Sequence, residues 1–274
     1  MKTLTKSFKL NNGIQMPCLG FGTFEIEKDD AIRASILEAL NVGYRHIDTA
    51  SMYKNEEGIG NAIKESDVLR REIFLTSKVW NGDHGYDSTL KAFEASLKKL
   101  KTDYLDLYLI HWPKDLNKET WKALERLYDE KLIRAIGVSN FKVHHLNEIM
   151  AKANICPMVN QVEFHPQLQN KEVLDFCLKS NIQLEAWGPL MQGEVFSIDL
   201  MKDLAIKYNK TISQITLRWD IQMGVVAIPK SVTPSRIKEN TEIFDFEISL
   251  EDMEKIASLN KEERIGPDPD EITF

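Results

Sequence analysis

The chain has 274 residues, of which 43% are hydrophobic and 28% are charged, a composition that excludes disordered, collagen-like and membrane-embedded proteins. Its 42 acidic residues outnumber its 35 Lys and Arg residues, and the net charge of -7 argues against non-specific binding to nucleic acid or anionic lipid. The three cysteines form no C-x-x-C pair, and no stretch approaches the roughly 20 apolar residues of a membrane span, so we expect a protein of the reducing cytoplasm.

The first predicted element is a β-hairpin at residues 8–16. Its side chains alternate around the pair Asn12-Gly13, and an Asn-Gly pair is typical of a two-residue hairpin turn. We expect this hairpin to have a structural role.

Eight short segments rich in β-branched, aromatic or aliphatic residues are predicted to be buried strands. They are residues 18–22, 44–48, 72–78, 104–110, 132–138, 157–162, 182–187 and 225–229. Helical patterns lie between them, as at residues 31–40. After the possible cap Asp87-Ser88, apolar residues recur at spacings of three and four, at Leu90, Phe93, Leu97 and Leu100.

Strand and helix alternate eight times at intervals of about 30 residues, the period of a βα unit with a right-handed crossover. We therefore predict an α/β protein with a single (β/α)8 barrel domain over residues 1–274, in preference to an open doubly wound sheet. The hairpin would close the N-terminal end of this barrel. Catalytic groups in such barrels come from the C-terminal ends of the strands, so polar residues after each apolar run are the candidates.

Neighbouring strand ends provide four ionisable side chains. Asp48 and Tyr53 follow the second strand, Lys78 lies at the end of the third, and His111 follows the fourth. Taken alone, each has a simple structural explanation, such as a helix cap for Asp48 or a core histidine for His111. Brought together at one rim, they suit proton transfer to a carbonyl group.

The chemistry assigns each of these groups a task. A tyrosine hydroxyl has an ordinary pKa of about 10, so it donates a proton readily near neutral pH only if a neighbouring cation stabilises the phenolate. Lys78 is the predicted cation for Tyr53, and Asp48 would pair with its ammonium group. His111 would hydrogen-bond the substrate oxygen. Reduction of the carbonyl also requires a hydride donor.

No glycine-rich dinucleotide turn identifies that donor. Residues 20–25 lack the third glycine of such a turn, and residues 58–60 follow no strand. The eighth strand, however, leads into a segment in which Thr233 and Pro234 are predicted to be the N-cap and the first residue of a helix. Barrels commonly bind a phosphate at this place.

The predicted helix start is flanked by side chains that suit a phosphate. Lys230, Ser231 and Arg236 could form charge-assisted hydrogen bonds with one, and a 2′-phosphate, hence NADPH, fits best. The structural alternative is a capped helix with two solvated cations.

The motifs together resemble the aldo-keto reductase family over nearly the whole chain. Residues 43–50 with Tyr53, residues 76–80 and residues 111–113 look like the Asp-Tyr-Lys-His tetrad of that family. Residues 137–141 look like its fifth-strand signature, and residues 228–231 like its adenosine phosphate loop.

The resemblance implies a set of cofactor contacts. Ser139, Asn140 and Gln161 would bind the nicotinamide carboxamide, and Trp187 would stack on the ring. The full set of implied cofactor residues is Gly22, Thr23, Asp48, Ser139, Asn140, Gln161, Trp187, Gly188, Pro189, Leu190, Lys230, Ser231, Val232, Arg236, Glu239 and Asn240.

The implied activity is NADPH-dependent reduction of a small aldehyde or ketone by a monomer, with Tyr53 as the proton donor. The substrate pocket would be lined by Phe24, Met52, Tyr53, Trp80, His111 and Trp112. Phe24 replaces a Trp and Trp187 a Tyr that many members have, so both positions keep an aromatic face. Short segments near Met191 and after Lys261 resemble the small prokaryotic and protozoan reductases named for diketogluconate or prostaglandin substrates.

Three other functions compete with this interpretation. A metal-dependent hydrolase could use His46, Asp48, His111 and His165 as ligands. A glycosidase could pair Glu163 with Glu185, although Glu185 is expected to support Trp187 instead. A catalytically weak NADP(H)-binding module could sense redox state, but the intact tetrad weighs against it.

Overall fold

The computed structural model describes residues 6–274 and contains one eight-stranded parallel sheet whose strand order follows the chain. All eight predicted strands are present, with bounds shifted by a few residues. They are β3 (Phe21–Gly22), β4 (His46–Asp48), β5 (Phe74–Val79), β6 (Leu105–Ile110), β7 (Ile133–Ser139), β8 (Val159–Glu163), β9 (Gln183–Trp187) and β10 (Val226–Ala227).

The first and last strands of this sheet meet and close it into a barrel. Leu19 forms a parallel bridge with Ala227, and the Gly20 amide donates to the Ala227 carbonyl at 2.9 Å. Two residues further on, the Gly22 amide donates to the Pro229 carbonyl at 3.0 Å. The predicted (β/α)8 barrel is therefore confirmed.

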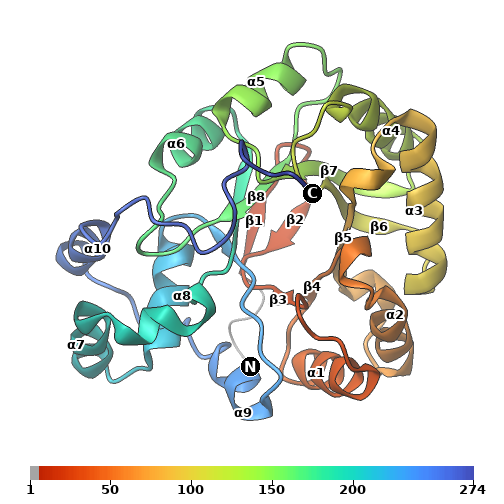
Figure 1. Ribbon diagram of the computed structural model, residues 1–274. Helices are drawn as coiled ribbons and strands as arrows, with labels where there is room; N and C mark the ends of the chain where they lie inside the picture. The colour runs from red at the N-terminus through yellow and green to blue at the C-terminus, as the bar shows by residue number, and fades with distance from the viewer. Residues whose placement is uncertain (1–5) are drawn as a thin grey trace.

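Helices surround the barrel, as Figure 1 shows. They are α1 (Asp29–Asn41), α2 (Glu56–Glu65), α3 (Tyr86–Leu100), α4 (Asn117–Asp129), α5 (Val143–Met150), α6 (Lys171–Lys179), α7 (Asp199–Tyr208), α8 (Ile212–Gln222), α9 (Pro234–Glu239) and α10 (Leu250–Ala257). Within residues 6–274, none of them has the length and apolar character needed to cross a membrane.

The apolar stripe of α3 faces the barrel as predicted, since Phe93 and Leu100 are buried. The predicted cap at Asp87-Ser88 is wrong, because the helix begins at Tyr86 and its N-cap is Gly85 with φ of +110°. The Ser88 hydroxyl donates to the carbonyl of the preceding turn at His84, 2.7 Å away, instead of capping the helix.

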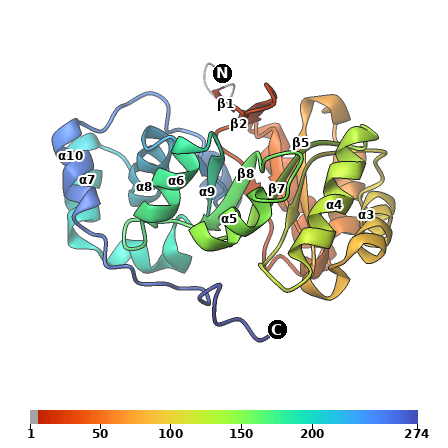
Figure 2. The ribbon, with the colours of Figure 1, turned by 90° about the horizontal axis from the view of Figure 1, so that it is seen from above.

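The N-terminal hairpin pairs β1 (Ser7–Lys9) with β2 (Gln15–Pro17) in antiparallel register. Its loop has three residues rather than the two predicted, because Leu10 and Ile14 still pair and only Gly13, with φ of +90°, adopts a left-handed backbone. The side chain of Asn12 donates to the Arg134 carbonyl near the start of β7 at 2.9 Å. The hairpin therefore covers the N-terminal end of the barrel, opposite the C-terminal end of the chain in Figure 2.

Candidate active site

Two of the predicted catalytic side chains, Asp48 and Tyr53, meet at the ammonium group of a third, Lys78, which projects from β5. Lys78 Nζ lies 2.7 Å from Asp48 Oδ1, 2.9 Å from the Thr49 carbonyl oxygen and 3.5 Å from the hydroxyl oxygen of Tyr53. Asp48 is the last residue of β4, and Tyr53 belongs to the short 3-10 turn Ser51–Tyr53 that follows it. The parallel register of β4 and β5 places these strand ends side by side.

His111 completes the predicted group of four. It follows β6, and its backbone amide donates to the Val79 carbonyl at 3.2 Å, which holds it against the end of β5. Its ring meets the Tyr53 ring edge to face at a centroid distance of 5.7 Å and the Trp80 ring at 5.1 Å. The structure thus brings together all four side chains that the sequence singled out.

Electrostatics fix the protonation of this group near neutral pH. Burial works against the Lys78 ammonium, but Asp48 together with Tyr53 and Glu185 holds the pKa of Lys78 above its ordinary value. Burial raises the pKa of Tyr53, and Lys78 opposes that rise. Burial, with Lys78 and His84 nearby, holds the pKa of His111 well below its ordinary value. The site therefore presents a protonated phenol and a neutral imidazole.

A second set of predicted residues is linked to the first through Asn140. The Asn140 amide donates to the His111 carbonyl at 3.0 Å and to the Ser139 hydroxyl at 3.1 Å. Its oxygen accepts a hydrogen bond from the indole nitrogen of Trp187 at 2.8 Å. Asn140 has φ of +65°, a left-handed conformation that Asn adopts more easily than most residues. The sequence predicted that Glu185 supports Trp187. In the structure the indole N–H of Trp187 instead donates to Asn140.

Beneath these residues, Gln161 joins two buried carboxyl groups. Its Nε2 atom lies 2.8 Å from Asp48 Oδ2 and 2.8 Å from Glu185 Oε2. The other oxygen of Glu185 lies 3.5 Å from Nε2 of His46, and both side chains are fully shielded from solvent. The sequence predicted that Glu185 supports Trp187 and missed Gln161 and His46 as its neighbours, because they lie on distant segments of the chain.

The predicted cofactor phosphate segment lies after β10 at the surface. Thr233 and Pro234 occupy the N-cap and first position of α9, as predicted. The side chains of Lys230 and Arg236 are exposed, and the Ser231 hydroxyl accepts from the Thr233 amide at 3.1 Å. The segment therefore presents two cations and a hydroxyl to an anionic ligand.

The remaining predicted cofactor residues line the rim between these two regions. Thr23 donates through its hydroxyl to the Asp48 carbonyl at 2.8 Å, and Gly22 allows the chain to approach the Ile228 carbonyl closely. Gly188 has φ of +63° and open space where a Cβ atom would stand. Of the other members, Pro189 and Asn240 are buried, Leu190 is half-buried and Val232 is exposed. The Glu239 carboxylate accepts a hydrogen bond from the Thr211 hydroxyl.

Aromatic side chains line the space next to Tyr53. The exposed ring of Phe24 packs on Tyr53 at 5.0 Å, and Met52 is half-buried beside it in the chain. On the other side, Phe274 stacks on Trp80 at 5.7 Å with an interplanar angle of 8° and meets Trp112 edge to face at 5.5 Å. The sequence analysis did not predict this role of Phe274. The one feature that could have indicated it is that an aromatic residue follows the charged segment after Lys261.

The tail that carries Phe274 crosses the C-terminal face of the barrel. The amide of Ile265 donates to Glu163 Oε1 at 2.6 Å, and Gly266 packs so closely on Trp187 that an added Cβ would lie 2.4 Å from the indole. Further along, Lys142 Nζ lies 2.6 Å from Asp270 Oδ2. Glu163 is thus used to hold the tail, which argues against a glycosidase that pairs it with Glu185.

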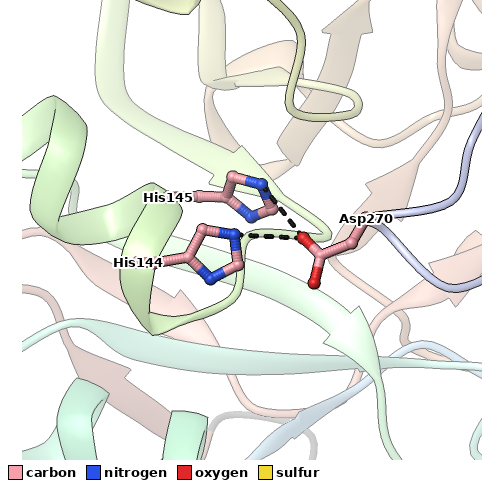
Figure 3. A group of neighbouring side chains, drawn as sticks. All are labelled: His144, His145 and Asp270. Carbon is pink, nitrogen blue, oxygen red and sulfur yellow. Dashed lines mark ion pairs between the residues drawn. The ribbon is translucent and has the colours of Figure 1, made fainter.

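Figure 3 shows His144 and His145 of α5 pointing toward Asp270. Their Nε2 atoms lie 3.0 and 3.4 Å from Asp270 Oδ1. In residues 6–274 this is the one group of three His, Cys, Asp or Glu side chains close enough to hold a metal ion, so the alternative ligand set around His46 does not assemble.

The donor set at Asp270 does not suit a metal ion. The Lys142 amide donates to Nδ1 of His145 at 3.2 Å, so the neutral ring carries its proton on Nε2 and has no lone pair there for a metal. The ammonium group of Lys142 already pairs with the same carboxylate. The cluster therefore anchors the tail to α5.

Comparison with known proteins identifies the family of this chain. The model of the aldo/keto reductase family matches residues 18–261. A glyoxal reductase of Bacillus subtilis is 58% identical over 99% of each chain. A 9,11-endoperoxide prostaglandin H2 reductase of Trypanosoma cruzi is 49% identical over 95% of this chain and 94% of the relative.

A solved structure agrees with these sequence matches. A variant of the protein Gox0644 in complex with NADPH superposes with a TM-score of 0.94 at 41% identity, covering 98% of this chain and 99% of that chain. The resemblance found in the sequence is thus confirmed, and the chain belongs to the aldo/keto reductase family of oxidoreductases.

Proposed function

We propose that this protein reduces small aldehydes with NADPH and that Tyr53 donates the proton. The observation that carries the proposal is the buried ammonium group of Lys78, 2.7 Å from Asp48 and 3.5 Å from the Tyr53 hydroxyl. The relative named glyoxal reductase supports glyoxal and similar dicarbonyl compounds as substrates. The relative solved with NADPH supports the choice of cofactor.

Each side chain of the proposed site has a physical task. Tyr53 gives its proton to the carbonyl oxygen, and the neighbouring Lys78 ammonium stabilises the phenolate that remains. Asp48 holds that ammonium in place and keeps it charged. His111, as a neutral imidazole, donates a hydrogen bond to the same oxygen and turns it toward Tyr53. Bound NADPH supplies the hydride.

The residues around the rim fit such a cofactor. Ser139, Asn140 and Gln161 bring amide and hydroxyl groups together next to Trp187, a suitable setting for a carboxamide beside a stacking surface. Gly188 leaves open space where Pro189 and Leu190 would follow a pyrophosphate. We assign the exposed cations Lys230 and Arg236, with Ser231, Val232, Glu239 and Asn240, to the adenosine 2′-phosphate.

The substrate side fits a small carbonyl compound. Phe24 packs on Tyr53, Trp80 on His111, and Phe274 on Trp112, so we assign these aromatic residues and Met52 to an apolar pocket in which Tyr53 and His111 supply the polar contacts. We further infer that residues 1–274 form one domain that acts as a monomer in the cytoplasm, where its three free cysteines stay reduced. Sedimentation of the purified chain tests the monomer.

The experiment that tests the proposal compares Tyr53 with a second tyrosine outside the site, Tyr108. Purified wild type, Tyr53→Phe and Tyr108→Phe are mixed with NADPH and glyoxal, and loss of the reduced cofactor is followed. We expect Tyr53→Phe to bind NADPH but to lose turnover by roughly a hundredfold or more, as when a proton donor is removed. Tyr108→Phe is the control, since Tyr108 is fully buried on β6 outside the site.

Two outcomes would contradict the proposal. Undiminished turnover by Tyr53→Phe would refute the proton donor. A wild-type protein that binds NADPH but consumes none with glyoxal, methylglyoxal or an aromatic aldehyde would favour the redox-sensing module instead.

A further inference from the structure

Gln161 has an unusual position between two acidic side chains. It lies in register with Glu185 on the neighbouring strand, and both side chains are almost completely buried in the barrel. The single atom Nε2 donates one hydrogen to Asp48 Oδ2 and the other to Glu185 Oε2, each at 2.8 Å. Both hydrogens of the amide are therefore used within the protein.

This double contact fixes which way the amide points. An amide oxygen could not face two acceptor oxygens at 2.8 Å, so the shared atom is the nitrogen and Oε1 of Gln161 points elsewhere. Asp48 is held by Lys78 in the catalytic group. The hydrogen bond from Gln161 is the one that links Glu185 to that group, and an ionised Glu185 would also act on Lys78 and Tyr53 through its charge.

The surroundings of Glu185 suit a neutral carboxyl group. Asp48 and His46 face it from β4 and Lys78 from β5, and Tyr53 lies beyond Lys78. Burial, reinforced by the charge of Asp48, raises the pKa of Glu185 to about 8. When the proton of Glu185 is on Oε1, which lies 3.5 Å from Nε2 of His46, the other oxygen of the carboxyl group, Oε2, still accepts the hydrogen bond from Gln161.

We propose that Glu185 is a positioning residue for the reduction. It orients the Gln161 amide so that Oε1 is left to accept a hydrogen bond from the carboxamide NH2 of a bound nicotinamide. This inference rests on the proposed function, because that function assigns Gln161 to the nicotinamide.

The test compares two variants with two cofactors. Glu185→Met has a similar volume but cannot accept from Gln161, whereas Glu185→Gln keeps an oxygen for Gln161 and an NH2 group for His46. Dissociation constants are measured by quenching of tryptophan fluorescence with NADP+ and with its 3-acetylpyridine analogue, in which a methyl group replaces the carboxamide NH2. The analogue therefore lacks the hydrogen that Oε1 of Gln161 would accept.

We expect Glu185→Met to weaken NADP+ binding about tenfold, the cost of one well-oriented hydrogen bond, and to change analogue binding less than about twofold. Glu185→Gln restores NADP+ binding to the wild-type value. The control is Asp220→Asn on α8, which alters another fully buried carboxyl group, outside the site, and leaves both dissociation constants unchanged. If Glu185→Met does not fold by circular dichroism, the smaller Glu185→Ser takes its place.

The outcomes separate this inference from the proposed function. Equal losses with NADP+ and the analogue, or no loss in Glu185→Met, would overturn the role of Glu185 while wild-type turnover with NADPH still supports the function. A wild-type protein that binds neither cofactor would overturn both.

Discussion

The Lys78 ammonium group and the Asp48 carboxylate form an ion pair of 2.7 Å that is almost completely shielded from solvent. Such a pair contributes little net stability by itself, because removing both charges from water costs about as much as their attraction returns. Breaking it is different, since the remaining charge is buried without a partner. The pair therefore ties the protonation of the active site to the stability of the barrel.

Asp48→Asn tests this connection. We expect it to lower the free energy of unfolding by about 3–5 kcal/mol, because the Lys78 ammonium loses its buried partner. Turnover of glyoxal should fall as well, since Asp48 no longer holds the Lys78 ammonium beside the Tyr53 hydroxyl. Urea denaturation and NADPH consumption measure the two effects. Asp199→Asn, which breaks the exposed pair with Lys202, is the control. An unfolding midpoint like that of the wild type would contradict the expectation.

Arg236→Ala tests the assignment of the 2′-phosphate. We expect it to raise the dissociation constant of NADPH about tenfold or more, because a charge-assisted hydrogen bond to the 2′-phosphate is lost. The dissociation constant of NADH, which lacks this phosphate, should stay nearly unchanged. Lys238→Ala is the control, because Lys238 is an exposed cation on the same short helix with no predicted role. The measurement is cofactor fluorescence on binding. Similar losses for the two cofactors would show that Arg236 does not discriminate between them.

Phe274→Ala tests the aromatic wall that the tail contributes. The ring lies against both Trp80 and Trp112, so its removal widens the substrate space. We expect kcat/KM to rise for bulky aromatic aldehydes relative to glyoxal, by a factor of several, because the apolar pocket then admits a larger group. Ile206→Ala on the outer helix α7 serves as the control. An unchanged ratio between the two aldehydes would place Phe274 outside the pocket.

Glu185→Gln is also expected to change how stability depends on pH. The pKa of Glu185 is raised to about 8 in the folded protein, whereas an unfolded glutamate has a pKa of about 4.3. The folded state keeps a proton that the unfolded chain releases. The stability contributed by this proton is fully present below the unfolded pKa and is lost as the pH rises toward 8.

Glutamine does not titrate, so the variant lacks this loss. The unfolding midpoint of Glu185→Gln minus that of the wild type should therefore increase between pH 4.5 and pH 8, in the interval set by the two pKa values. Urea denaturation at several pH values measures it. A difference that stays constant over this range would mean that Glu185 is ionised in the folded state.

The barrel could be predicted because its strands are short, apolar and regularly spaced along the chain. The four catalytic candidates could be predicted because the C-terminal ends of parallel strands meet at the same rim of the barrel. Local geometry was harder. The sequence predicted a two-residue loop at Asn12-Gly13, but Leu10 still pairs with Ile14 and leaves three residues in the loop, and the Asn12 side chain donates to the Arg134 carbonyl, 122 positions away. The contact of Glu185 with Gln161 and the stacking of Phe274 on Trp80 could not be predicted, since each joins segments that only the folded chain brings near.

The side chain of Asn140 has a consequence for the shape of the substrate space. One short amide, in a left-handed backbone conformation, is bonded both to the His111 segment and to the Trp187 indole. It therefore fixes the spacing between the His111 segment and the Trp187 ring, which the proposed function assigns to the carbonyl oxygen and to the nicotinamide. If the proposed function is right, this fixed spacing sets how an aldehyde carbonyl fits between the two, and the aromatic residues Phe24, Trp80 and Phe274 would contact the rest of the substrate.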